Sequence, residues 1–229
     1  MLIIFMYSAY NIYIIVNGYT ENKKVYDNIN EIVTNEEDEI DINKERYDKL
    51  KSINEDYRFW LYIPQTNISY PVVYGTDNEE YLYKNFEGNE NKGGSIFIDY
   101  RNTEQDTDNL IIHGHNMKDK SMFGTIPDML SQEYFNKNTS IYIYLQDQIL
   151  EYKIFSAYVN HGDFNPYIIK FNSDEEFNEY INIARSKSYF EFDYIEDNEK
   201  DILTLSTCTN ATGIERTIIH AKLTNITDL

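Results

Sequence analysis

Two neighbouring strand-like segments near the C-terminus place the strongest constraint on the fold. Residues 202–210 (ILTLSTCTN) alternate aliphatic and polar side chains and are rich in β-formers, a pattern typical of a half-buried strand. Residues 216–223 (RTIIHAKL) form a second such segment, and the short link between the two contains Gly213. This arrangement predicts an antiparallel hairpin, which returns Arg216 to the neighbourhood of Cys208, the only cysteine of the chain.

Further strand-like segments lie along the rest of the chain. They are residues 68–73, 95–100 and 110–113, together with residues 139–158, which alternate over two runs and predict a hairpin. Helical patterns occupy residues 42–60, 79–86 and 121–130, and a capping box at Ser173 and Glu176 opens a helix over 174–188. Because the helices do not alternate with the strands, the sequence predicts a mainly β barrel and not a doubly wound sheet.

Composition narrows the class of protein. A content of 41% hydrophobic and 15% aromatic residues is enough for a packed core. Twenty Lys and Arg against 39 Asp and Glu give a net charge of −19, which argues against nucleic acid and anionic membrane surfaces as partners. A single cysteine excludes an internal disulfide and a cysteine-rich zinc module.

Three motifs occur in the order found in one known family. They are TLSTC at 204–208, Arg216 after it, and GHN at 114–116 upstream. In these motifs the chain resembles the class B sortases, cysteine transpeptidases of the Gram-positive cell surface, and the resemblance runs from about residue 60 to residue 223. It implies a sortase-type β-barrel of about eight strands with N-terminal helices and a helix in the loop before the cysteine strand.

The resemblance also implies a mechanism. A thiol with an ordinary pKa of about 8.5 needs a base or a nearby positive charge to react at neutral pH. In the implied reaction Cys208 attacks a Thr carbonyl in a sorting motif of the Asn-Pro-x-Thr type, and His115 protonates the leaving amine. A cell-wall amine then resolves the thioacyl enzyme, while Arg216 holds the substrate backbone or the oxyanion. No cofactor is expected.

The partners implied are surface proteins with a C-terminal sorting signal and a peptidoglycan amine as the acceptor. Substrate contacts are implied for a larger set of residues: Asn78, Leu82, Tyr167, Ile168 and Ser206. A helix cap, a core leucine and loop packing would explain Asn78, Leu82 and the Tyr167–Ile168 pair equally well. No carboxylate that orients His115 is apparent.

The N-terminus suggests a membrane anchor. Residues 2–16 are nearly all apolar or aromatic, but a spanning helix needs about 20 such residues. Lys23 and Lys24 follow the run and no basic residue precedes it, so we expect the native chain to begin upstream of Met1. The expected division is an anchor at 1–22, a linker and helical region at 23–62 and the catalytic barrel at 63–229. The protein would then be a single-pass protein of the cell membrane with an extracellular catalytic domain.

Two other functions remain open from the residues alone. His113, His115 and Cys208 would supply three ligands for a metal-dependent hydrolase, although no fourth ligand is evident. Alternatively, Cys208 is a small buried hydrophobe in a non-catalytic surface domain. His220 is a weaker candidate for the base, because it shares the strand face of Arg216 but lies two pleats further from Cys208. His161 is weaker because it lies in a loop with no motif around it.

Overall fold

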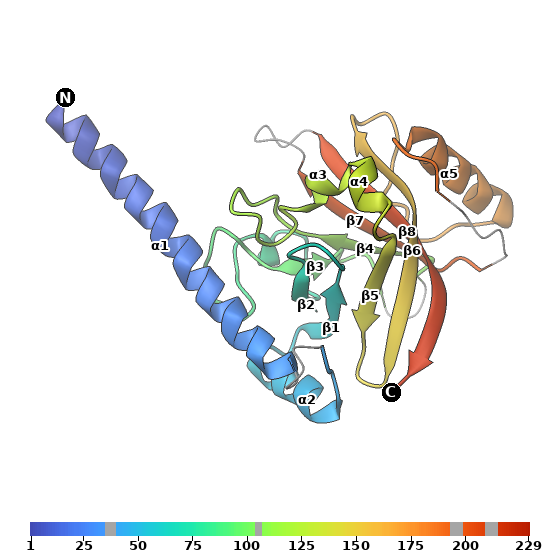
Figure 1. Cartoon of the computed structure of the whole chain (residues 1–229), viewed down its shortest axis with the longest axis horizontal. Coiled ribbons are helices and arrows are strands. Elements are labelled where there is room, and N and C mark those ends of the chain that lie inside the picture. Colours follow the sequence, from blue (N-terminus) through green and yellow to red (C-terminus); the bar gives the residue numbers. More distant parts are fainter. Residues whose placement is uncertain (35–39, 104–106, 193–198, 209–214) are drawn as a thin grey trace.

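Within residues 1–34, 40–103, 107–192, 199–208 and 215–229, which the computed structural model describes, eight segments rich in aromatic and β-branched residues form a closed barrel. Neighbouring strands follow the order β1-β2-β3-β4-β7-β8-β6-β5 around it (Figure 1). The strands are β1 (Tyr57–Tyr62), β2 (Ser69–Val73), β3 (Ile96–Ile98), β4 (Asn109–His113), β5 (Ser140–Tyr144), β6 (Gln148–Asn160), β7 (Ile202–Cys208) and β8 (Arg216–Asp228). The predicted mainly β barrel of about eight strands is confirmed.

The strand pairing brings the two main sequence motifs to one edge of the barrel. Strands β4 and β7 are parallel, with His113 opposite Ser206. Strands β7 and β8 are antiparallel, with Cys208 opposite Arg216, as the predicted hairpin requires. The chain segments that follow His113 and Ser206 therefore leave the sheet side by side.

Alternation along β7 separates the barrel interior from its outer face. Leu203 and Leu205 are fully buried in the main apolar cluster, which also contains Trp60. Burying a leucine side chain contributes about 1.5–3 kcal/mol. Thr204 and Ser206 point the other way, where Thr204 contacts Asn109 and Ser206 contacts the loop between β6 and β7. The polar face predicted for this strand is thus real, but it is covered.

Helices lie on the outside of the barrel (Figure 1). They are α1 (Leu2–Val33), α2 (Lys44–Ile53), the 3₁₀ helix η1 (Glu80–Leu82), α3 (Ile126–Met129), α4 (Gln132–Phe135) and α5 (Asp174–Lys187). Ser173 caps α5 by accepting a hydrogen bond from the Glu176 backbone N–H, as predicted. This confirms a helix in the loop before the cysteine strand.

The N-terminal segment differs from the prediction. A single helix of 32 residues runs through both the expected anchor and the first part of the expected linker. Its C-terminal part packs on the barrel through Tyr26, Ile29 and Val33, whereas its N-terminal part extends away (Figure 1). Across the described residues, no helix combines the length and the apolar character needed to cross a membrane. Ser8 and Asn11 interrupt the short apolar run. This finding contradicts the predicted single-pass anchor, on which the predicted localisation rested.

The helix predicted over 42–60 is also too long. Helix α2 ends at Ile53, where the Asn54 backbone N–H still bonds to the Leu50 carbonyl. Tyr57 and Trp60, which matched the helical spacing, lie in β1 instead. The run YRFWLY consists largely of aromatic residues that favour strands, and strand pairing with β2 and β5 overrides the helical pattern. The barrel consequently begins at Tyr57, before residue 63.

Candidate active site

A cavity of about 420 Å³ opens at the edge of the barrel where β4 and β7 end. Most of the residues predicted to act on a substrate line it. The lining consists of Asn78, Leu82, Phe97, Asp99, Arg101, His113, Gly114, His115, Tyr167, Ser206, Thr207 and Arg216. Its volume lies within the range of about 300–1,000 Å³ that is typical of ligand sites.

The predicted nucleophile lies at this edge. Cys208 is the last residue of β7, and in the backbone register its partner is Arg216, the first residue of β8. The side chain of Cys208 lies outside the described part of the structure. The Arg216 side chain lines the cavity, and its Nη1 donates to the Glu215 carbonyl at 3.4 Å.

His115 is held by a backbone carbonyl. Its Nε2 lies 2.8 Å from the carbonyl oxygen of Leu82. Because a carbonyl only accepts hydrogen bonds, Nε2 carries the hydrogen, and Nδ1 of the neutral ring is left as the proton acceptor. This carbonyl supplies the orienting group that the sequence did not reveal. Leu82 thus serves the site through its backbone as well as through its place in the cavity wall.

The backbone around His115 is fixed on both sides. Thr207 Oγ1 donates to the Gly114 carbonyl at 2.8 Å, and the Phe123 backbone N–H donates to the His115 carbonyl at 2.9 Å. A Cβ at Gly114 would lie 2.8 Å from the Phe123 ring, closer than real Cβ contacts allow. Glycine is therefore required before the histidine by a close packing contact.

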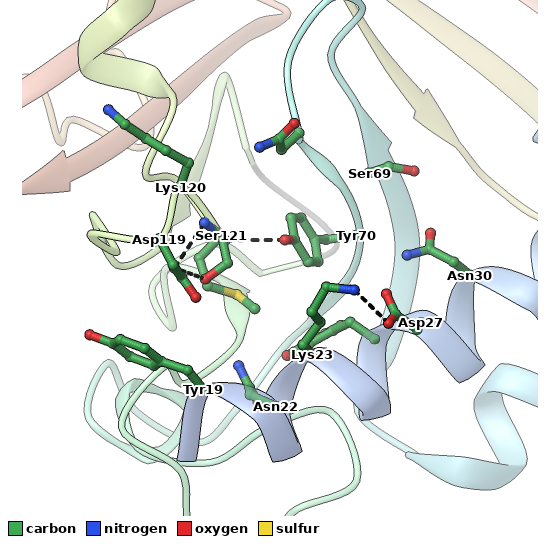
Figure 2. Close-up of a pocket in the computed structure, with 13 residues that line it drawn as sticks. Tyr19, Asn22, Lys23, Asp27, Asn30, Ser69, Tyr70, Asp119, Lys120 and Ser121 are labelled. Carbon is green, nitrogen blue, oxygen red and sulfur yellow. Dashed lines mark hydrogen bonds and ion pairs between the residues drawn. The ribbon is translucent and has the colours of Figure 1, made fainter. Parts of the chain in front are cut away.

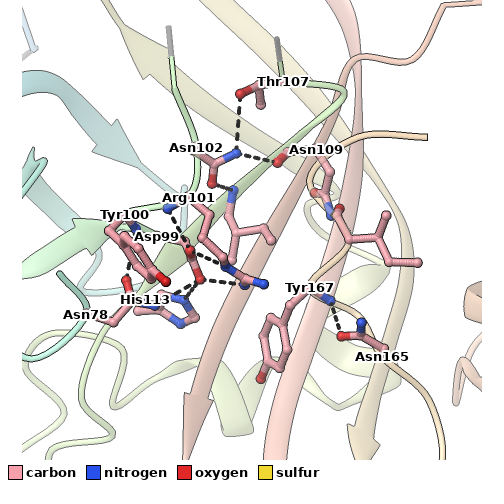
Figure 3. Close-up of polar contacts among 12 residues, drawn as sticks. Asn78, Asp99, Tyr100, Arg101, Asn102, Thr107, Asn109, His113, Asn165 and Tyr167 are labelled. Atoms are coloured by element: carbon pink, nitrogen blue, oxygen red, sulfur yellow. Dashed lines mark hydrogen bonds and ion pairs between the residues drawn. The ribbon is translucent and has the colours of Figure 1, made fainter. Parts of the chain in front are cut away.

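A buried carboxylate organises one wall of the cavity (Figure 3). Asp99, whose side chain is 1% exposed, accepts two hydrogen bonds from the Arg101 guanidinium, at 2.8 and 2.9 Å. Its Oδ2 also lies 3.0 Å from His113 Nε2 and accepts a hydrogen bond from Asn78 Nδ2 at 3.1 Å. Burial opposes ionisation, but the hydrogen bonds from Arg101 and His113 prevail and hold the pKa of Asp99 well below its usual range. Asp99 is therefore ionised, and it also raises the pKa of Arg101.

The loop between β6 and β7 also lines the cavity, through Tyr167. The Tyr167 hydroxyl lies 2.9 Å from Ser206 Oγ, and its ring centroid is 5.8 Å from that of His113. Ile168 is not among the residues that line the cavity. It packs against the apolar cluster under α5, and its carbonyl accepts a hydrogen bond from Asn109 Nδ2 at 2.9 Å.

The remaining histidines lie apart from the cavity. His220 is fully buried, bonded to Thr204 Oγ1 at 2.9 Å and to the Tyr158 hydroxyl at 3.1 Å. Burial lowers the pKa of His220 to about 3, so it is neutral at physiological pH. His161 is exposed and pairs with Glu215 at 2.8 Å. Neither is placed to act as the base at this cavity.

The alternative of a metal-dependent hydrolase gains no support. In the part of the chain that the structure describes, which leaves out the Cys208 side chain, no group of three or more His, Cys, Asp or Glu side chains could hold a metal ion. His113 turns its Nε2 to Asp99, and His115 turns its Nε2 to a carbonyl. Each histidine is therefore positioned by its own hydrogen-bond partner.

Comparison with known proteins gives one consistent result. The sortase domain family matches residues 61–224. Sortase B of Listeria monocytogenes is 30% identical over 226 residues, which cover 96% of this chain and 92% of that protein. A crystal structure of sortase B from B. anthracis has a TM-score of 0.81 and 32% identity, and covers 92% of this chain and 100% of that one. A Staphylococcus aureus sortase B–substrate complex has a TM-score of 0.74 and 29% identity, and the match covers 80% of this chain and 86% of that chain.

Proposed function

The chain belongs to the sortase family as a class B sortase and is a cysteine transpeptidase, and from this premise we propose its substrates and the residues that act on them. The family supports surface proteins as substrates. We propose that the enzyme cuts their C-terminal sorting signal after Thr in a motif of the Asn-Pro-x-Thr type. It then transfers the new carboxyl end to a peptidoglycan amine.

The observation that carries the proposal is the convergence of three elements on one cavity. The end of β4 presents His115, the end of β7 presents the backbone of Cys208, and the start of β8 presents Arg216. A base, a thiol and a guanidinium at one edge are the parts that thiol-based acyl transfer needs.

The first half of the reaction forms a thioester. His115 takes the proton of the Cys208 thiol, Sγ attacks the Thr carbonyl carbon, and the Arg216 guanidinium stabilises the tetrahedral oxyanion. The peptide C–N bond then breaks, and His115 gives a proton to the departing amine. In the second half, the acceptor amine attacks the thioester, the C–S bond breaks, and His115 takes the proton that the amine loses.

The cavity walls are proposed to hold the sorting peptide. Asn78 and Leu82 come from the segment around η1, Tyr167 from the loop between β6 and β7, and Ser206 from β7. Ile168, next to Tyr167, would act by supporting that loop. We further propose that the catalytic unit predicted at 63–229 extends back to the start of β1 and so comprises residues 57–229, with 23–56 as a supporting region.

Turnover of a panel of sorting peptides tests the proposal. A peptide containing Asn-Pro-x-Thr is incubated with the enzyme and a glycine-based amine, and both cleavage and the ligated product are measured by mass spectrometry. Cys208→Ala should abolish both activities without changing the unfolding midpoint, because it removes the nucleophile and little volume. Residual turnover in Cys208→Ala, or failure of Cys208 to react with a thiol reagent, would refute the assigned mechanism.

A further inference from the structure

A second cavity lies between α1 and the barrel (Figure 2). It encloses about 490 Å³ and shares none of its lining residues with the catalytic cavity. Helix α1 forms one side, β2 another, and the loop after His115 the third. The lining consists of Tyr19, Asn22, Lys23, Tyr26, Asp27, Asn30, Asn67, Ser69, Tyr70, Asp119, Lys120, Ser121 and Met122.

A buried polar atom without a partner lies at this cavity. Asn22 is 5% exposed, and its Oδ1 has no hydrogen-bond partner among the described residues. Buried side-chain oxygens are normally hydrogen-bonded, so such an atom needs an explanation. In Figure 2 the Asn22 amide extends from α1 into the space between the helix and the loop. A ligand that donates a hydrogen bond would satisfy it.

The loop that closes the cavity adopts an unfavourable backbone. Lys120 and Met122 have φ angles of 66° and 51°, in the left-handed region that side chains with a Cβ rarely occupy. Both residues line the cavity. Strain of this kind persists where the surroundings impose it, and it concentrates at binding sites.

The polar groups of the lining offer both kinds of hydrogen bond. Ser69 Oγ accepts from Trp60 Nε1 at 3.0 Å, and the Tyr70 hydroxyl accepts from the Met122 backbone N–H at 3.3 Å. Each hydroxyl therefore keeps its own hydrogen for donation, whereas Asn22 Oδ1 requires a donor. An ammonium group would satisfy only Asn22, and a carboxylate would satisfy only the two hydroxyls. Ligand hydroxyls both donate and accept, and they match all three.

The charges of the lining cancel. Its two lysines are balanced by two aspartates, Asp27 and Asp119, and Lys23 pairs with Asp27 at 2.9 Å. The neighbouring barrel is closed, so no strand edge is open for a peptide to extend. A charged ligand and an added peptide strand are both disfavoured.

We propose that this cavity binds a neutral, hydroxyl-rich carbohydrate. The ligand hydroxyls donate to Asn22 and accept from Ser69 and Tyr70. Tyr19, which also lines the cavity, adds an aromatic surface of the kind that covers apolar faces of a ligand. The site holds a ligand and performs no chemistry.

Titration with neutral disaccharides tests the proposal. The probes are di-N-acetylchitobiose and cellobiose, followed by amide chemical shifts of the whole chain in NMR spectra. We expect saturable shifts in α1 and in the loop around Lys120, and the same shifts in Cys208→Ala. Asn22→Ala should weaken disaccharide binding at least tenfold. Asn67 is an exposed residue of the lining, so Asn67→Ala carries little risk to the fold, and it should weaken binding severalfold. Peptide turnover should stay unchanged in both variants.

The matched control is Asn178→Ala, an exposed asparagine of α5 far from the lining. It should leave the dissociation constant unchanged. The proposal is overturned if neither disaccharide produces saturable shifts at millimolar concentration, or if the shifts lie only at the catalytic cavity. It is also overturned if Asn22→Ala and Asn67→Ala, both folded by their unfolding midpoints, bind as well as Asn178→Ala.

Discussion

Replacing Asp99 by Asn should destabilise the protein strongly although the side chain keeps its shape. In the wild type, Oδ1 accepts from the Arg101 backbone N–H and Nε, and Oδ2 accepts from Arg101 Nη2, His113 and Asn78. An amide places an NH₂ group at one of these two positions. In either orientation it therefore faces at least two donors.

The magnitude follows from the hydrogen bonds lost. A hydrogen bond that involves a charged group contributes about 1.5–3 kcal/mol. Two are lost in the less costly orientation, and the Arg101 side chain is 42% exposed, so water replaces part of what it loses. We therefore expect Asp99→Asn to lower the free energy of unfolding by about 3 kcal/mol at pH 7.

The effect should depend on pH in a definite direction. The folded-state pKa of Asp99 lies well below its unfolded value of about 3.9. The stability that ionised Asp99 contributes is therefore complete above about pH 3.9 and is lost as the pH falls below it. Between pH 7 and pH 3 the difference in the free energy of unfolding between wild type and Asp99→Asn should shrink by about 1 kcal/mol. The other carboxylates are common to both proteins and cancel in the difference.

Urea unfolding followed by fluorescence measures both quantities. The chain has one tryptophan, Trp60, which is fully buried in the barrel, so a single fluorophore reports the loss of the core. Glu133→Gln serves as a control, because its pair with Lys137 is largely exposed, and it should leave the midpoint unchanged at pH 7. Equal midpoints for wild type and Asp99→Asn, or a difference that is the same at pH 3 and pH 7, would refute the reasoning.

Three further outcomes are expected. His115→Ala should lower kcat/KM for a sorting peptide by about 10²–10⁴-fold, whereas the exposed His161→Ala should keep most of it; equal losses in peptide assays would contradict the assigned base. Gly114→Ala should lower kcat/KM by about 10–100-fold, because the new Cβ meets the Phe123 ring at 2.8 Å and displaces the histidine, and adding Phe123→Leu should restore part of the rate. The folded-state pKa of His220, about 3, is below its unfolded value, so its contribution to stability is complete above about pH 6.5 and falls as the pH drops. Wild type should lose about 2–3 kcal/mol at this site between pH 7 and pH 4.5, and a His220→Gln variant that shows the same loss in urea unfolding would disprove this.

The barrel could be predicted from the sequence because its strands carry local signals. The alternation of residues 202–208 and the turn before β8 predicted the hairpin that pairs Cys208 with Arg216. The capping box at Ser173 predicted the start of α5. The errors fell where local pattern and tertiary pairing disagree. Tyr57 and Trp60 match a helical spacing, and only pairing with β2 and β5 makes their segment a strand.

The organisation of the site was harder to predict from the sequence. A backbone carbonyl has no side-chain signature, so the sequence cannot reveal that Leu82 orients His115. The partnership of Asp99 with His113 joins two strands whose register is set by the whole barrel. His113, which the sequence presented as a possible metal ligand, is therefore explained only when Asp99 is placed beside it.

The parallel pairing of β4 with β7 has a consequence for biosynthesis. It joins segments far apart in the chain, as the hydrogen bond from Thr207 to Gly114 across 93 positions illustrates. Strand β8 then lies between β7 and β6, so the barrel stays open until translation has passed Asp228. A ribosome-bound chain therefore contains both His115 and Cys208 before the strand that closes the barrel is complete. The order of the strands therefore makes the completed edge of the barrel, with Cys208 opposite Arg216, depend on the last strand to be made.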